Sequence, residues 1–557
     1  MKLLKLSILL ICLGANLINT HEHSHAHKDG KCGHKHNLIP EIGIGAEMPK
    51  RITEDPKKRK LRSRSHPFKV HVDTSNVRGV SANVKKYLEE VIAVQGNKIF
   101  AEKIGVTGYQ TVPGDSRIPR YCTYQHIVQV PDRYATQDTD ADFVLLLATD
   151  DTGNDGTLAY ATACFMERGT NRPNVGLAVF NPYYLKPENG KLDNDVATYV
   201  HEVLHALVFS SQLWKKFPLT RAGKKQYVIS KDKHYLRGDN LLSTVRDHFG
   251  CQGIPAVPLE DDGGEGSKGG HFERIVFGDE TMVSEDVAVA KFSKITLALM
   301  KDSGWYDIDL SKGDHYTWGK GEGCGIFNTT CAANSVEETC SKNNNFGCDK
   351  TYNFKMTCTR TAFTGQCNIK TKGNSCASGS DRLQYFESKG ISSRCQEYYY
   401  NGQKKAGCVK TRCNRNGTKY QVTLNPYYSS DEPIKYVCSR ENEVKSQIQM
   451  GKKHHFICEN PKLICGNLCP KGCYGRGKCL ENGNCSCDPM FKGEICGTFK
   501  GCGNLGNELC RQIVYSNKLD YKNYTNSYSQ YDFNPDYNSL TSWADLQRNL
   551  VSTDSGI

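Results

Sequence analysis

The segment HEVLHALVFS, which begins at His201, contains metal-binding residue types at helical spacing. Residues four apart lie on one face of an α-helix, so the imidazoles of His201 and His205 can bind the same metal ion. Glu202 follows the first histidine and is placed to accept a proton from a water activated by that ion. The alternative is an amphipathic core helix with the same letters. Two histidines and a glutamate in this order suggest a zinc site, and a third ligand is needed to distinguish it from the core helix.

A catalytic zinc ion usually takes three protein ligands, so a third group is needed elsewhere in the chain. The downstream candidates are His234, His248, His271, His315, His454 and His455. His271 is favoured because the glycine-rich stretch LEDDGGEGSKGG precedes it, and glycines allow a backbone to turn tightly toward a distant site. His248 lies near the end of a predicted helix, where a packing or capping role is favoured over metal binding.

Several elements are predicted to position these residues. Phe68, Val70 and Val72 alternate with polar residues, which predicts the first strand, with one buried face. The apolar runs at 140–150 and 174–182 predict buried strands, and TLAYATACF between them predicts a third. Asp193 or Asn194 then caps a helix. Its predicted inward face consists of Val196, Val200, Val203 and Leu207. Strands followed by a long helix indicate an α/β or α+β domain.

The cysteines divide the chain into regions of different character. Of the 26 cysteines, three lie between residues 66 and 320, and twenty-one lie beyond residue 323. The middle of the chain can therefore rely on a hydrophobic core, whereas the C-terminal part reads as disulfide-stapled modules. From Cys469 the spacing C-x3-C-x5-C-x5-C-x-C-x8-C, which ends at Cys496, resembles an EGF-like module. A generic disulfide knot is the alternative.

The N-terminus has the features of a secretory signal peptide. Lys2 and Lys5 precede an apolar run at residues 6–13 that is too short for a permanent membrane anchor. No later stretch is apolar over the ~20 residues that a transmembrane helix needs. The C-terminal LVSTDSGI lacks the hydrophobic tail of a GPI signal. We therefore expect a secreted protein, and sequons at Asn328, Asn416 and Asn523 agree with that route.

Residues 21–65 are rich in His, Lys and Arg and poor in apolar residues, which predicts a pro-segment rather than a folded domain. The formal charge of +12 is dispersed except for KKRKLRSR at 57–64, inside that segment. We therefore expect no nucleic-acid partner, and a processing site within 57–64.

Residues of about 66–460 resemble the leishmanolysins, which are metzincin-type zinc endopeptidases. The resemblance is carried by HEVLHALVFS, by LEDDGGEGSKGGHFER with its late histidine, by GDETM and by MKDSGWY. DADFVLLLA, LAYATACF and RPNVGLAVFNP add agreement upstream. The implied fold is α+β: a metzincin-like catalytic domain with a twisted sheet and an active-site helix, a mixed subdomain, a Cys-rich disulfide-stapled domain and the EGF-like module.

The resemblance also implies a site and a reaction. His201, His205 and His271 bind one Zn²⁺ per chain, Glu202 is the general base, and Met282 forms a floor beneath the metal. An extended protein or peptide substrate pairs with the strand at Leu158, Ala159, Tyr160 and Ala161 by β-augmentation. A zinc-activated water attacks the peptide carbonyl, and the glutamate passes the proton to the leaving amine.

One position departs from the family pattern HExxHxxG, because Val208 stands where the glycine is found. A β-branched residue tolerates a positive φ poorly. A helix that ends here in a left-handed turn would therefore be strained. The alternative is a helix that continues through Phe209 and turns later.

Cys32 lies alone in KDGKCGHKH, within the predicted pro-segment. A thiolate is a good zinc ligand and can occupy the position of the catalytic water. Leishmanolysins are similar in carrying a pro-segment cysteine followed by a histidine, and CGHKH fits that pattern loosely. Cys32 is therefore the candidate latency switch, with an inert free thiol or a disulfide partner as the alternatives.

The expected organisation is as follows: signal peptide 1–20, pro-segment 21–65, N-terminal catalytic subdomain 66–210, central subdomain 211–323, Cys-rich domain 324–464, EGF-like module 465–497 and tail 498–557. A cell-surface or matrix protein is the expected partner of the EGF-like module. A catalytically silent adhesive or surface protein is the alternative function, although the intact Glu202 favours the enzyme. A metal-sequestering protein would rest on His21, His23, His25, His27, His34 and His36.

Overall fold

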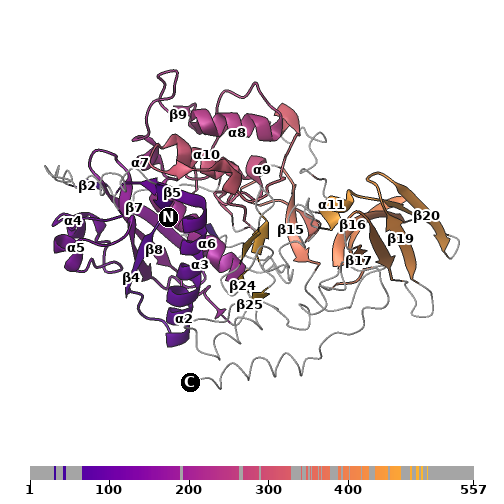
Figure 1. Cartoon of the computed structure of the whole chain (residues 1–557), viewed down its shortest axis with the longest axis horizontal. Coiled ribbons are helices and arrows are strands. Elements are labelled where there is room, and N and C mark those ends of the chain that lie inside the picture. Colours follow the sequence, from indigo (N-terminus) through magenta and orange to yellow (C-terminus); the bar gives the residue numbers. More distant parts are fainter. Residues whose placement is uncertain are drawn as a thin grey trace, which may run out of the picture.

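The computed structural model in Figure 1 describes most of residues 65–465 and short pieces on either side. The described residues are 31–32, 42–45, 65–108, 110–187, 192–262, 267–285, 287, 290–327, parts of 340–465, 477–479, 485–487, 491–492 and 498–499. The predicted signal peptide, most of the predicted pro-segment and nearly all of the tail lie outside them. Among the described residues, no helix combines the length and apolar character that a bilayer crossing requires.

A mixed sheet forms the core of the N-terminal part, with the strand order β1-β7-β8-β6-β4 and with β2 also paired to β7. Its strands are β1 (Lys31–Cys32), β2 (Gly43–Ile44), β4 (Val70–Asn76), β6 (Phe143–Thr149), β7 (Thr157–Met166) and β8 (Pro173–Phe180). Strands β4, β6 and β8 run parallel, and β7 is antiparallel to β8. The three predicted buried strands are therefore confirmed.

Strand β6 is apolar throughout because both of its faces are covered. Leu145 and Leu147 belong to one buried cluster, while Val144 and Leu146 belong to another on the opposite face. In a strand that is buried on both sides, an apolar residue at every position adds to the stability of the fold, because each side chain is removed from water. This explains the uninterrupted apolar run in the sequence.

Helix α6 (Leu192–Leu207) packs against β7 and β8 and carries the HEVLH motif. The predicted inward face is confirmed, since Val196, Val200, Val203 and Leu207 are all buried. The predicted cap was wrong: the helix begins at Leu192, so Asp193 and Asn194 lie inside its first turn. Helix α3 (Ala93–Lys103) packs on α6 through Gly96, where a Cβ would lie 2.2 Å from Cδ1 of Tyr199.

The first predicted strand differs from expectation at Asp73. Period-2 alternation places this residue on the solvent face, yet it is 2 % exposed. Its carboxylate accepts hydrogen bonds from Ser75, from the Tyr134 hydroxyl at 2.8 Å and from the Arg133 guanidinium. These partners, distant in sequence except for Ser75, satisfy the buried charge. Phe68, just before β4, is fully buried as expected.

The central part contains two helices, α8 (Asp239–Phe249), which is the helix predicted to end near His248, and α10 (Lys294–Asp302). They pack together, and a carboxylate joins their ends. Asp302, at the end of α10, accepts hydrogen bonds from the backbone N–H groups of Asn240 at 2.9 Å and Leu241 at 2.8 Å. The free N–H groups at the start of α8 are thus capped from another helix.

Removing this cap is expected to destabilise the central part. Asp302→Ala should lower the free energy of unfolding by about 1–2 kcal/mol, because the first turn of α8 loses its acceptor. Asp307→Ala, at an exposed position nearby, is the matched control and should stay close to the parent chain. Urea unfolding followed by circular dichroism measures both. Equal midpoints for the two variants would contradict the capping role.

Short sheets connect these parts. They are formed by β3 (Ser65–Pro67), β5 (Ile104–Thr107) and β12 (Asp307–Ile308), and by β9 (Tyr227–Ser230), β10 (Lys233–Leu236) and β11 (Val257–Pro258). In the first of these sheets, β5 pairs with β3, at the start of the N-terminal part, and with β12, which follows α10. The residues before the sheet core and those after the central helices therefore meet in one strand ladder.

Disulfides tie the middle and C-terminal regions together. Cys122 bonds Cys164, and Cys251 bonds Cys324. The second bond crosses the predicted boundary at residue 323, so the central and Cys-rich regions are covalently joined there. In the Cys-rich region the bonds are Cys340–Cys358, Cys348–Cys395, Cys376–Cys408, Cys413–Cys465 and Cys438–Cys458.

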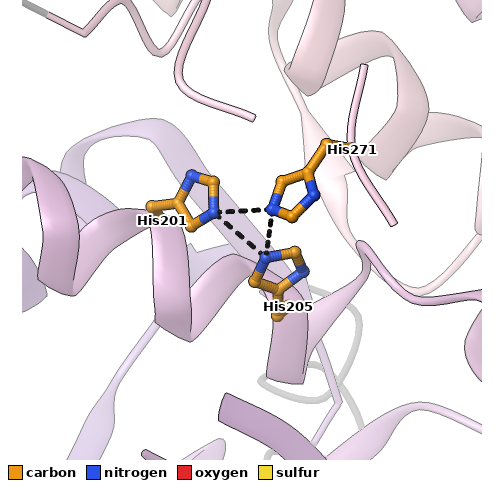
Figure 2. Close-up of side chains that lie close together, drawn as sticks. All are labelled: His201, His205 and His271. Carbon is orange, nitrogen blue, oxygen red and sulfur yellow. Dashed lines mark hydrogen bonds between the residues drawn. The ribbon is translucent and has the colours of Figure 1, made fainter. Parts of the chain in front are cut away.

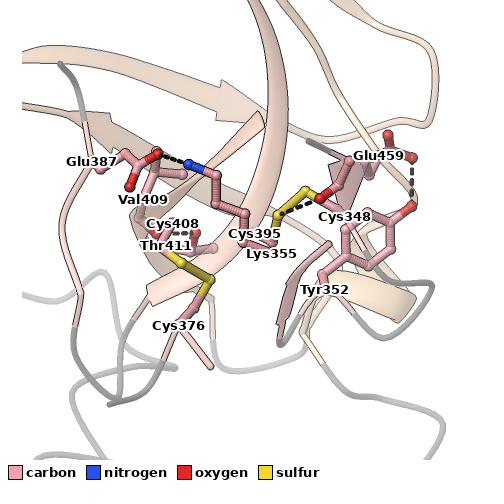
Figure 3. The surroundings of a disulfide bond; sticks show 11 residues. Cys348, Tyr352, Lys355, Cys376, Glu387, Cys395, Cys408, Val409, Thr411 and Glu459 are labelled. Atoms are coloured by element: carbon pink, nitrogen blue, oxygen red, sulfur yellow. Dashed lines mark hydrogen bonds and ion pairs between the residues drawn. A yellow bond between two sulfur atoms is a disulfide. The ribbon is translucent and has the colours of Figure 1, made fainter. Parts of the chain in front are cut away.

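The Cys-rich region is built on strands, β16, β17, β19 and β20 among them (Figure 1). They form one antiparallel sheet in the order β19-β18-β17-β16-β21-β20. They span Ser393–Tyr400 (β16), Gln403–Cys413 (β17), Tyr420–Leu424 (β18), Ile434–Cys438 (β19), Val444–Gln449 (β20) and Lys452–Ile457 (β21). A smaller sheet contains β13 (Gly347–Cys348), β14 (Phe354–Thr359) and β15 (Ile369–Ser375). Figure 3 shows disulfides and the Lys355–Glu387 ion pair of 2.5 Å cross-linking this region.

Of the predicted EGF-like module, the structure describes the hairpin of β22 (Gly477–Cys479) with β23 (Cys485–Cys487) and the strand β24 (Phe491–Lys492), which pairs with β25 (Thr498–Phe499) at the start of the predicted tail. The disulfide to Cys413 binds Cys465 to the preceding Cys-rich sheet. The module itself stays a prediction, because most of its cysteines lie outside the described residues.

Candidate metal centre

Three histidine side chains meet beside α6. His201 and His205 project from consecutive turns of the helix, and His271 approaches from a separate segment of the chain (Figure 2). The Nε2 atoms of His201 and His205 are 3.0 Å apart, and each is 3.2 Å from Nε2 of His271. All three residues are buried. The structure therefore brings together the three histidines that the sequence predicted as ligands.

The opposite ring nitrogen of each histidine faces a backbone carbonyl. Nδ1 of His201 lies 2.6 Å from the oxygen of Thr281, and Nδ1 of His205 lies 2.7 Å from that of Phe209. Nδ1 of His271 lies 3.3 Å from the oxygen of Ser267. Because a carbonyl can only accept, we assign the ring proton of each histidine to Nδ1 from this network.

This assignment leaves a lone pair on each Nε2 atom. Burial lowers the pKa of His201 to about 4, so this ring is neutral at physiological pH. Lone pairs that face one another at 3.0–3.2 Å repel unless a cation lies between them. The donor chemistry is thus that of a metal centre, with a carbonyl orienting each ligand from behind.

The spacing also fits zinc. A tetrahedral zinc ion with Zn–N bonds of 2.0–2.1 Å holds its ligand nitrogens about 3.3 Å apart. The observed separations of 3.0–3.2 Å are close to that value. Three imidazole donors leave one position of a tetrahedron for water or substrate, which is the arrangement of catalytic zinc sites.

The glycine-rich segment delivers His271, as its composition predicts. Gly269 adopts φ +68°, and a Cβ there would lie 2.8 Å from the His234 ring, so both conformation and space require glycine. The segment closes on itself through hydrogen bonds from Gly269 N to the Glu260 oxygen at 2.7 Å and from Glu260 N to the His271 oxygen at 2.9 Å. His234 therefore packs against the loop that carries His271.

The Glu260 carboxylate anchors the same loop from inside. It accepts hydrogen bonds from Asp262 N at 3.0 Å, Arg274 N at 3.2 Å and the Ser284 hydroxyl at 2.8 Å. Burial raises the pKa of Glu260 to about 7. The side chain thus joins the segment before His271 to the one after Met282.

Met282 is fully buried in a turn that contacts both sources of ligands. Its carbonyl accepts from Phe272 N at 2.8 Å, next to His271, while the preceding residue, Thr281, supplies the carbonyl that faces His201. Glu280 holds the turn by accepting hydrogen bonds from Met282 N at 2.9 Å and the Thr296 hydroxyl at 2.8 Å. Burial raises the pKa of Glu280 to about 7.

Glu202 is 0 % exposed on α6, directly after the first histidine. The strain considered at Val208 does not arise, because this residue is not among the described residues with a positive φ. The helix ends at Leu207 rather than continuing through Phe209. Both Val208 N and Phe209 N donate to the Leu204 oxygen at 2.8 Å, which turns the chain without a left-handed residue.

Other predicted residues are not members of the three-histidine cluster. His248 packs in α8, with Nε2 2.8 Å from the Trp318 oxygen and its ring stacked on Tyr316, which agrees with the packing role favoured for it. The candidate substrate residues 158–161 lie on β7. The backbone of Cys32 pairs with Ala159 of that strand through β1.

Several functional groups escaped prediction. They are the orienting carbonyls of Thr281, Phe209 and Ser267 and the carboxylates of Glu260 and Glu280. A carbonyl has no signature in residue type, so no sequence signal could identify the first three. The two glutamates did carry a signal, since each is an acid inside one of the quoted motifs, LEDDGG and GDETM.

A sheet, a helix bearing two histidines, a third histidine on a separate loop and a buried methionine turn together have the layout of a metallopeptidase. The family model for peptidase M8, leishmanolysin, matches residues 85–396. The chain belongs to the leishmanolysin family, as the sequence resemblance predicted.

Individual relatives match over shorter regions. A leishmanolysin-like peptidase of Drosophila melanogaster is 31% identical over 212 residues, 31% of this chain and 31% of that protein. A leishmanolysin homolog of Crithidia fasciculata is 27% identical over 297 residues, covering 52% and 43%. The ciliated left-right organizer metallopeptidase of Homo sapiens is 31% identical over 231 residues, covering 38% and 28%. Each match spans less than half of the relative's length.

Proposed function

We propose that this protein is a secreted, zinc-dependent endopeptidase. His201, His205 and His271 hold one zinc ion per chain, and Glu202 is the general base. The observation that carries the proposal is the meeting of three Nε2 atoms at 3.0–3.2 Å while each Nδ1 faces a backbone carbonyl. A histidine cluster that served only packing would not need to direct three lone pairs at one point.

Each residue around the metal is proposed to have a separate role in peptide hydrolysis. When bound, zinc supplies a Lewis acid that activates water and polarises the scissile carbonyl. Glu202 accepts the proton of the attacking water at its carboxylate and delivers it to the leaving amine. Burial keeps this carboxylate away from bulk water, which strengthens its interaction with the developing charges. Met282 closes the space beneath the histidines.

Strand β7 is the proposed substrate strand. It hydrogen-bonds to β8 on one side, and an extended peptide adding to the opposite side would continue the sheet. Residues Leu158–Ala161 lie on this strand, and α6 packs against the sheet that contains it. A substrate paired here is held by backbone hydrogen bonds, which accept many side-chain sequences.

The direct test of the proposal measures metal and turnover together. Purified processed protein should contain one zinc per chain and hydrolyse casein, and a chelator such as 1,10-phenanthroline should abolish turnover until Zn²⁺ is restored. Zinc content without hydrolysis of casein or of peptide libraries would instead support the silent adhesive protein on the same fold.

Cys32 remains the proposed latency switch. In the unprocessed chain its thiolate would take the position of the catalytic water, and cleavage within residues 57–64 would release it. The unprocessed chain should therefore gain turnover on Cys32→Ser. Equal inactivity of the two unprocessed chains would assign latency to the bulk of the segment.

The C-terminal tail is expected to be dispensable for chemistry, because no proposed ligand or base lies beyond Met282. A chain truncated after Gly497 should cleave a fluorogenic peptide with unchanged kcat/KM. A second truncation, before Gly477, additionally removes the contacts of Ser486 with Glu102 and of the Cys487 carbonyl with Lys98 on α3. It should lower the melting temperature. Lost turnover in the first chain would contradict the assignment.

A further inference from the structure

Two short strands from the N-terminal part of the chain, β1 and β2, pair with the edge of β7 that faces away from β8. Lys31 and Cys32 pair in parallel with Thr157 and Ala159, and Gly43 and Ile44 pair in parallel with Phe165 and Met166. Among the described residues, these two short strands are the partners of β7 on this side. The labels β2 and β7 lie side by side in Figure 1.

The second of these contacts requires glycine. A Cβ at Gly43 would lie 2.5 Å from Cδ2 of Phe165 and 2.5 Å from Cδ2 of Tyr121, which is closer than real Cβ contacts. Gly43 has no positive φ, so the restriction comes from space and not from backbone conformation. Its neighbour Ile44 points outward and is 40 % exposed. The strand therefore fits because its inward-facing position has no side chain.

Gly45 completes the contact. Its N–H donates to the Met166 oxygen at 2.9 Å, and a Cβ there would lie 3.2 Å from Cε1 of Phe165. Both glycines are buried although they belong to the predicted pro-segment. The alternation Gly-Ile-Gly thus matches the pleat of a strand that lays its bare face on the Phe165 ring.

The slot that receives Gly43 is rigidly built. Tyr121 lies on α4 (Ile118–Cys122), and the next residue, Cys122, is bonded to Cys164, the neighbour of Phe165 on β7. The Tyr121 and Phe165 rings are 6.2 Å apart. A disulfide adjacent to both walls prevents the slot from widening to accept a larger residue.

The two N-terminal contacts bracket the part of β7 that faces the metal-bearing helix. Ala163 pairs with Gly176 of β8, where a Cβ would lie 3.0 Å from the Cβ of Ala206, the residue after His205. The segment contacts β7 at Ala159 and at Phe165, on either side of Ala163. A peptide added to this edge at Ala159 or Phe165 would have to displace the segment.

We propose that Tyr121 and Phe165 form a glycine-selective docking slot for residues Ile42–Gly45 of this chain, and that this docking holds the N-terminal segment across the substrate edge of β7. The conclusion that the docked segment blocks substrate binding rests on the proposed peptidase function. The docking itself does not depend on that function. The slot acts through backbone pairing and shape. It needs neither Cys32 nor a metal ion, so it is a second, separate anchor of the segment.

The test uses the unprocessed full-length chain with Gly43→Val and, as matched control in the same strand, Ile44→Ala. The first places a side chain in the slot, and the second trims an outward side chain. The readout is hydrogen–deuterium exchange of residues 157–166, with the melting temperature recorded to confirm folding. Gly43→Val should raise exchange of the outer amides of β7 about tenfold or more, because overpacking detaches the strand. Ile44→Ala should match the parent.

Hydrolysis of a fluorogenic peptide provides the second readout and separates the two proposals. Gly43→Val should also show more turnover than the parent before processing, and the same turnover after removal of residues 1–64. Parent-like exchange in Gly43→Val, or equal exchange in both variants, overturns the docking slot. Raised exchange in Gly43→Val with no hydrolysis by any chain supports the slot and overturns the peptidase function instead.

Discussion

Glu202→Gln is expected to abolish peptide hydrolysis while the chain keeps its zinc. Glutamine preserves the shape of the buried side chain but cannot accept a proton, and loss of a general base typically lowers turnover by about 10²–10⁴-fold. The histidines and their carbonyl partners are untouched by the change. Zinc content by mass spectrometry and kcat on a fluorogenic peptide measure the two effects separately.

The outcomes of this substitution discriminate between roles. Retained zinc with lost turnover supports the base. Lost zinc would make Glu202 a structural support of the ligands, and parent-like turnover would require another base. Glu285→Gln is a useful control, since Glu285 is a buried glutamate paired with Arg274 at 2.8 Å and has no proposed part in proton transfer.

His271→Ala is expected to empty the metal centre. The change removes one of three donors, and since loss of even an outer-shell partner costs about 10–100-fold in metal affinity, loss of a ligand should cost at least about 100-fold. Zinc occupancy after dialysis against a weak chelator measures the effect. Peptide hydrolysis should fall in parallel.

His248→Ala is the matched control for that experiment. His248 is buried, like His271, but its ring contacts the Trp318 carbonyl and Tyr316. Its removal should lower thermal stability and leave zinc occupancy unchanged. The reverse pattern, with zinc lost from the His248 variant and kept in the His271 variant, would overturn the ligand assignment.

Local spacing made part of the site predictable from sequence. His201 and His205 share one helix, so the distance between them follows from helix geometry alone. His271 lies 66 residues beyond His205, so helix spacing cannot place it. Its prediction rested on the glycine-rich loop and the family resemblance. The loop does deliver it, through Gly269 and the backbone bonds of Glu260.

Long-range contacts account for what the sequence did not predict. Asp73 is buried because Arg133 and Tyr134, about sixty residues away, meet its carboxylate. At the end of α6, both Val208 N and Phe209 N donate to the Leu204 oxygen, and this hydrogen-bond pattern has no signature in residue type. The start of α6 was also mispredicted. Asp193 or Asn194 was expected to cap the helix, but the helix begins at Leu192, because an aspartate is as well suited to the first turn of a helix as to the cap position. Pattern reasoning identified elements and faces but not these partners.

The three carbonyls behind the histidines have an evolutionary consequence. Thr281, Phe209 and Ser267 orient the ligands through main-chain oxygens, which every amino acid carries. Substituting any of the three residues changes a side chain and leaves the oxygen in place, provided that the backbone path is kept. The proposed metal centre is thus buffered against point mutation in its surroundings. Drift at these positions can alter neighbouring surfaces while the geometry of the ligands is inherited unchanged.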